Sequence, residues 1–190
     1  MAFVLAYAPM ASRPLSDSEI AEARLVFQSS LDYTHAYVSE DASWPDWVDS
    51  IGASLQRRVR DPDDHNAITL GQTSYFPVTL DTSPAAIAAN QLRDMAWLMH
   101  ELTHQWQFSR LGWSYLASAL SVQLRLGRMA YNYQGDYPTL DAALLAAHAE
   151  GKKLADFNLE QQGDIVRDCY YRVKQGINTS AWDPFIAELR

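Results

Sequence analysis

The segment His100-Glu101-Leu102-Thr103-His104 constrains this 190-residue chain more than any other feature. Two histidines four residues apart lie one turn apart on the same face of a helix, where their imidazole nitrogens can bind one metal ion. Glu101 projects beside them and can take a proton from a water molecule on that ion. These residues are typical of a zinc peptidase, although two ordinary surface histidines on a helix would show the same spacing.

The sequence around this segment favours a helix packed against a core. Residues 85–108 read as one long helix, and the histidines lie on a face next to its apolar stripe. A half-buried face of this kind suits a metal site. The stripe consists of Ala88, Leu92, Met95, Met99, Leu102 and Trp106.

A catalytic zinc ion needs a third protein ligand and an open fourth position. Gln107 and Arg110 stand where the metzincin pattern has glycine and histidine, so this ligand comes from elsewhere in the chain. Glu160 is the best candidate, and Asp164 on the same helix face could accept a hydrogen bond from the second nitrogen of a ligating histidine. A carboxylate that only stabilises a helix N-terminus is the alternative role for Glu160. Rival ligands are Asp141, His148, Glu150 and Asp156.

Hydrolysis of an amide bond also needs a donor to the oxyanion of the tetrahedral intermediate, besides zinc and the general base Glu101. We favour Tyr133, because its aromatic loop could close over a substrate, although it could equally pack on the core surface. Arg167 is expected to pair with Asp164 or Asp168. Other candidate donors are Tyr131, Tyr170, Tyr171 and His148.

Length and composition set the remaining limits. The length predicts a single domain over residues 1–190, and the net charge of −8 argues against nucleic-acid binding. The single cysteine, Cys169, excludes an internal disulfide and fits a helical apolar stripe as a core residue. No membrane span is expected, since the apolar stretch at 111–124 is too short. The N-terminus resembles a signal peptide only weakly, which favours a cytoplasmic protein or export by a non-Sec secretion machine.

The pattern of caps, alternation and turn residues predicts an α+β chain that is mostly helical, with a small N-terminal sheet. Ser16 and Glu19 form a predicted capping box. The expected helices cover residues 16–29, 85–108, 111–124, 140–154 and 159–176, and a short last helix is expected with Asp183 as its N-cap and Pro184 as its first residue. The expected strands cover 31–39 and 67–76, the latter as one or two short strands around Gly71, and turns or loops lie at 40–47 and 61–64.

Four segments, in this order, carry a family resemblance. The spacing of Glu160 and Asp164 looks like the second motif of gluzincins, the thermolysin-like zinc peptidases. The whole set resembles a bacterial zinc metallopeptidase domain found with contractile injection systems, type VI secretion spike-related proteins and polymorphic toxins. The segments are Arg13-Pro14-Leu15, Ala67-Ile68-Thr69-Leu70-Gly71-Gln72-Thr73-Ser74-Tyr75-Phe76, Leu98-Met99-His100-Glu101-Leu102-Thr103-His104-Gln105-Trp106-Gln107 and Asn158-Leu159-Glu160-Gln161-Gln162-Gly163-Asp164.

The resemblance implies a zincin-like fold with a zinc-binding helix. It implies Zn²⁺ ligation by His100, His104 and Glu160, with Glu101 as the base acting on a peptide or protein substrate. It also suggests a secretion-system spike or a toxin as a partner. Two other functions remain open: hydrolysis of a peptidoglycan amide, and a non-catalytic binding module stabilised by zinc.

Overall fold

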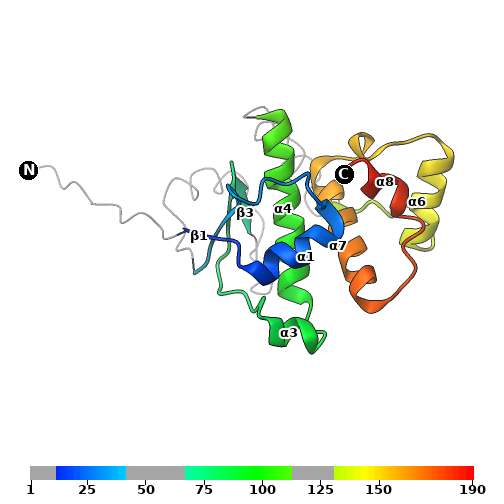
Figure 1. Cartoon of the computed structure of the whole chain (residues 1–190). Helices are drawn as coiled ribbons and strands as arrows, with labels where there is room; N and C mark the ends of the chain where they lie inside the picture. The colour runs from blue at the N-terminus through cyan, green and yellow to red at the C-terminus, as the bar shows by residue number, and fades with distance from the viewer. Residues whose placement is uncertain (1–11, 42–66, 113–130) are drawn as a thin grey trace, which may run out of the picture.

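The structure is a computed structural model that describes residues 12–41, 67–112 and 131–190. A small sheet lies on one side of a long central helix, α4 (Arg93–Leu111), and the C-terminal helices lie on the other (Figure 1). Helix α1 (Asp17–Phe27) crosses α4 in this view, and α3 (Pro84–Ala88) lies near the lower end of α4. The described residues are therefore α+β, as predicted, with more of them in helices than in strands.

The sheet has the order β1 (Ser12–Pro14), β2 (Tyr37–Ser39), β4 (Thr73–Tyr75), β3 (Ile68–Leu70). The β1–β2 and β3–β4 pairs are antiparallel, whereas β2 and β4 are parallel. Strands β3 and β4 form a hairpin around Gly71, which has a φ of 66°, so the prediction of short strands on either side of this glycine is confirmed.

Helix α1 begins with the predicted capping box, in which the side chains and backbone N–H groups of Ser16 and Glu19 bond reciprocally. Glu19 is completely buried and also accepts hydrogen bonds from Arg13 and from Thr82 Oγ1. Burial alone would raise the pKa of Glu19, but these bonds outweigh it and hold the pKa below its usual value. One carboxylate therefore ties β1, α1 and the segment before α3 together.

The prediction of one helix over residues 85–108 is wrong, because the structure has two helices there. Ser83 caps α3, and Asn90 then takes a left-handed conformation with a φ of 61° before α4 begins. Asparagine tolerates this conformation better than most residues, so the apolar spacing continues across a real break in the helix.

The predicted strand over residues 31–39 is also shorter than expected, since only Tyr37–Ser39 pair. Asp32 makes the difference. Its side chain bonds the backbone N–H and the hydroxyl of Thr34 and lies 2.7 Å from His35 Nδ1. A turn of this kind competes directly with strand pairing.

Helix α6 (Leu140–Ala149) ends five residues before the predicted boundary at Leu154. Gly151 has a φ of 79°, and Lys152 N–H bonds back to the carbonyl of Ala147. This is a helix C-terminal turn that the sequence pattern did not reveal. A short 3-10 helix, η2 (Leu154–Asp156), follows.

Helix α7 (Leu159–Gln175) agrees with its prediction at both ends. Asn158 caps its N-terminus, and Gly176 ends it in a left-handed conformation. The last helix, α8 (Asp183–Ala187), starts at the predicted Asp-Pro pair, but Trp182 rather than Asp183 occupies the N-cap.

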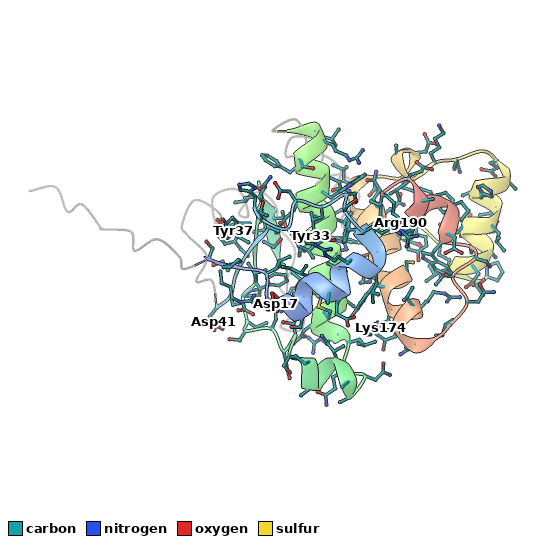
Figure 2. The ribbon with its side chains drawn as sticks, viewed as in Figure 1. Asp17, Tyr33, Tyr37, Asp41, Lys174 and Arg190 are labelled. Carbon is teal, nitrogen blue, oxygen red and sulfur yellow. The ribbon has the colours of Figure 1, made fainter. Side chains whose placement is uncertain are left out.

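Polar contacts link α1 to α7 and to the last residue of the chain. Lys174 Nζ on α7 lies 2.8 Å from Glu22 Oε1, and Arg190 donates to the carbonyls of Leu25 and Val26. Figure 2 labels Lys174 and Arg190. Cys169 is buried in the same core, as predicted, and its burial raises the pKa of the thiol to about 12.

Three predicted elements lie largely or wholly outside the described residues: the loop at 40–47, the turn at 61–64 and the helix at 111–124. Among the helices that the structure describes, none combines the length and apolarity that crossing a membrane requires.

Candidate metal centre

Helix α4 gathers three candidate functional side chains into a buried cluster. His100, Glu101 and His104 each offer a ligand atom, and these atoms lie within 4.8 Å of one another. Each residue is at most 6% exposed. The sequence spacing thus produces the expected shared face, but the face is interior rather than half-exposed.

Helix α7 brings Glu160 to the same point. Its Oε2 lies 3.3 Å from His100 Nε2 and 3.4 Å from His104 Nε2, and the two Nε2 atoms are 3.1 Å apart. A tetrahedral ion with bonds of about 2.0–2.1 Å separates its ligand atoms by about 3.3–3.4 Å. The two distances to Glu160 Oε2 match this spacing, and the 3.1 Å between the two Nε2 atoms is slightly shorter.

The tautomer of His100 follows from its contact with Asp164. Nδ1 of His100 lies 2.9 Å from Asp164 Oδ1, and Arg167 donates to the same oxygen. A carboxylate that is paired with arginine is an acceptor, so Nδ1 carries the hydrogen and Nε2 presents its lone pair. The structure thus joins Asp164 to the histidine as the sequence analysis expected, and Arg167 pairs with both Asp164 and Asp168.

The tautomer of His104 follows from a chain of amides. The carbonyl of Phe157 accepts from Gln162 Nε2, which leaves Gln162 Oε1 to accept from Gln107 Nε2. Gln107 Nε2 also donates to the carbonyl of Leu159. Oε1 of Gln107 therefore faces His104 Nδ1 as an acceptor at 2.8 Å, and Nε2 of His104 is again left with its lone pair.

When both rings are neutral, two imidazole lone pairs and a carboxylate oxygen therefore converge. Such a set of acceptors needs a cation or a proton between its members. The same arrangement of charges and acceptors also shifts the pKa values of these residues. Burial lowers the pKa of His100, but hydrogen bonds to Asp164 and Glu160 overcome it and raise the pKa to about 10. The pKa of Glu160 is lowered despite its burial, mainly by the nearby His104.

Gly163 makes the close approach of α4 and α7 possible. A Cβ on this residue would lie 2.7 Å from Cε1, 2.8 Å from Nδ1 and 2.9 Å from Nε2 of His100. Real Cβ atoms essentially never come so near, so only glycine leaves room for the ring at this helix position.

Glu101 differs from Glu160 in its partners. Its Oε2 accepts a hydrogen bond of 2.7 Å from Thr69 Oγ1 on β3, whereas Glu160 Oε2 lies against both histidines. Glu160 is therefore the better third ligand, and Glu101 remains beside the cluster with a separate anchor.

The tyrosine favoured by the sequence analysis has another partner. Tyr133 is buried and donates to Asp168 Oδ2, and burial together with that carboxylate raises the pKa of Tyr133. Tyr131 lies beside His100, with 6.0 Å between the two ring centroids. Of the other candidates, Tyr170 donates to Glu22, and Tyr171 is exposed.

The rival ligands have other partners. Asp141 pairs with Arg172, Glu150 pairs with Lys152, and Asp156 accepts from the backbone N–H of Lys153. His148 is exposed on α6, with its ring centroid 6.2 Å from that of Phe185.

Sequence reasoning missed three residues that shape the site: Thr69, Gln107 and Gly163. Only Gly163 gave a readable signal, since a glycine inside an amphipathic helix indicates either a weak helix or a close neighbour. Gln107 and Thr69 act through side chains whose partners come from other elements.

Comparison with known proteins gives a limited set of similarities, and no protein-family model matches the chain. The chain is 30% identical over 181 residues to the type VI secretion system spike protein VgrG2b of Pseudomonas aeruginosa. This match covers 95% of the chain but only 15% of the spike protein. The solved effector domain of the same VgrG2b is similar in structure, with a TM-score of 0.61, 25% identity, and coverage of 95% of this chain and 88% of that domain.

Proposed function

We propose that the chain is an effector domain of the type VI secretion kind that hydrolyses peptide bonds with a zinc ion held by His100, His104 and Glu160. The similarity to the VgrG2b effector domain supports the secretion role and export by such a machine. The convergence of three electron-pair donors supports the metal. This convergence carries the proposal, because one zinc ion can take up all three electron pairs at once, whereas a proton can join only two of these atoms.

The protein residues divide the chemistry between them. A zinc ion held by His100, His104 and Glu160 would polarise a carbonyl oxygen and would lower the pKa of a bound water molecule to about 7. Glu101 takes the proton from the attacking water and delivers it to the leaving amine. Asp164 and Gln107 fix the ring orientation and tautomer of the two histidines, so that both Nε2 atoms stay available.

Stabilisation of the oxyanion is assigned to Tyr131 rather than Tyr133. The hydroxyl of Tyr133 is already donated to Asp168, whereas the Tyr131 ring lies beside His100. A donor near the reacting carbonyl lowers the barrier by stabilising the charge that develops there.

The position of an edge strand beside the helix that carries His100 and His104 suggests a peptide substrate. Strand β3 is an edge of the described sheet and directly precedes β4 in the hairpin that faces α4. An extended peptide can pair with an edge strand through backbone hydrogen bonds, which places its carbonyl groups near α4.

A non-catalytic binding module stabilised by zinc is the second candidate. The similarity to the effector domain of a secretion spike protein supports a role in secretion for this candidate as well. A purely structural metal site has no need of Glu101, and this residue separates the two functions.

The variant Glu101→Gln tests the choice. We expect it to bind zinc as wild type does and to lose hydrolysis of an unfolded protein such as casein, because the amide cannot accept the proton. Glu150→Gln, at an exposed glutamate, is the matched control. If the wild-type protein binds zinc and cleaves purified peptidoglycan but not casein, the substrate is a peptidoglycan amide rather than a protein. Zinc binding without turnover on either would favour the binding module.

A further inference from the structure

The carboxylate of Glu101 receives its hydrogen bond from the sheet rather than from its own helix. Thr69 Oγ1 lies 2.7 Å from Glu101 Oε2 and 3.3 Å from the Glu101 backbone carbonyl. The shorter distance and the negative charge make Oε2 the dominant acceptor. Thr69 is 3% exposed, so water competes little for this bond.

Two further side chains determine the direction of this bond. Ser74, the register partner of Thr69, lies 2.8 Å away through its hydroxyl. Gln105 on α4 donates from Nε2 to Ser74 Oγ at 2.8 Å and to the carbonyl of Tyr37 at 3.0 Å. Because that carbonyl can only accept, it fixes the amide of Gln105 with nitrogen toward the sheet.

The positions of the hydrogens follow from this fixed amide. Both Nε2 hydrogens of Gln105 are used, so Ser74 accepts one and its own hydroxyl hydrogen is free to donate to Thr69 Oγ1. Thr69 then has one hydrogen left, and it goes to Glu101 Oε2. We call Gln105, Ser74 and Thr69 the hydroxyl chain.

We infer that Thr69, oriented by the hydroxyl chain, is a positioning residue for Glu101, an inference that rests on the proposed function. The terminal torsion of a glutamate is broad, so an unanchored carboxylate samples many orientations. The hydrogen bonds of the described residues engage only Oε2. The hydroxyl chain therefore uses Oε2 of Glu101 as the anchored oxygen and leaves Oε1 to exchange the proton with substrate and water.

The reason for such an anchor is geometric. A general base must lie within about 2.6–3.2 Å of the proton donor, and small misplacements of catalytic groups cost large factors in rate. Glu101 also offers a carboxylate oxygen within 4.8 Å of the ligand atoms of His100 and His104, so a carboxylate without this anchor could turn toward the metal and occupy its open position. The bond from Thr69 opposes that rotation.

The test compares Thr69→Val, which removes the hydroxyl at nearly constant shape, with Thr69→Ser, which retains it. Thr73→Val on the same hairpin is the matched control. The first measurement is a crystal structure of each zinc-loaded variant, which reports the Glu101 carboxylate directly and needs no activity. The second is kcat and KM on an unfolded protein, with zinc affinity measured in parallel.

We expect Thr69→Val to show the Glu101 carboxylate displaced or in several orientations. Its kcat should fall about 10- to 100-fold with little change in KM or zinc affinity, as is common for partners of this kind. Thr69→Ser should keep the carboxylate orientation and the kcat of wild type. An undisturbed carboxylate in Thr69→Val overturns the inference, and so does a kcat equal to that of wild type. If wild type binds zinc but hydrolyses nothing, the proposed function fails, and the crystal structures still decide the role of Thr69.

Discussion

Replacing Gly163 by alanine should perturb the proposed metal centre without changing any of its proposed ligands. The residue lies inside α7, where alanine is a better helix former than glycine by about 1 kcal/mol. The new methyl group would nevertheless lie 2.7–2.9 Å from three ring atoms of His100. The substitution should therefore stabilise helix α7 by its propensity and weaken metal binding by its contact with His100.

The size of the effect follows from these distances. Nonbonded carbon atoms prefer separations of about 3.5–4.0 Å, so the ring or the helix must move by roughly 0.8 Å or more to relieve the 2.7 Å contact with Cε1. Metal–ligand distances tolerate only about 0.2 Å. Overpacking of this kind costs about 1–3 kcal/mol, which corresponds to about 5- to 150-fold in the Kd for zinc if the metal site bears it.

Competition against a chromophoric chelator measures this Kd in wild type, Gly163→Ala and the control Val173→Ala, an exposed position on the same helix. Circular dichroism of the metal-free proteins checks folding, and we expect a loss of at most about 2 kcal/mol in unfolding free energy for Gly163→Ala. A folded Gly163→Ala with a zinc Kd within twofold of wild type would refute the reasoning.

Three more predictions concern other contacts. Asp164→Asn should weaken zinc binding about 10- to 100-fold in the same competition assay, because His100 loses the charged acceptor for its Nδ1 hydrogen. Cys169 should resist alkylation by iodoacetamide at neutral pH until denaturant is added, since burial raises its pKa to about 12; mass spectrometry of the native protein reads this out, and rapid native labelling would contradict it. Glu19→Gln should lower the unfolding free energy by about 1.5–3 kcal/mol at pH 7 in urea titrations, against little change for exposed Asp17→Asn. Because the folded pKa of Glu19 is lowered, its contribution is complete above the unfolded value near 4.5 and disappears as pH falls through the folded value, so a wild-type advantage that persists in strong acid would be inconsistent with it.

The sequence was most informative where the spacing of residues along one helix is enough to place them on the same face. His100, Glu101 and His104 share a face by helical geometry alone, and Glu160 and Asp164 share another. That these two faces would meet came from the family resemblance and from the ligand count of zinc. No local rule predicted it.

The remaining features depend on contacts between distant segments. The bond from Thr69 to Glu101 joins residues 32 positions apart, and the bond from Gln107 to Gln162 spans 55 positions. The errors in predicted strand and helix boundaries arise because local turns compete with regular secondary structure. The turn around Asp32 replaced a strand, and the left-handed Asn90 interrupted a helix whose apolar period continued.

Anomalous diffraction at the zinc edge from crystals of the zinc-loaded protein tests the central claim most directly. We predict one strong peak about 2.0–2.2 Å from Nε2 of His100, Nε2 of His104 and Oε2 of Glu160. The absence of a peak at this point, or a peak held by other residues, would contradict the metal centre and the chemistry built on it.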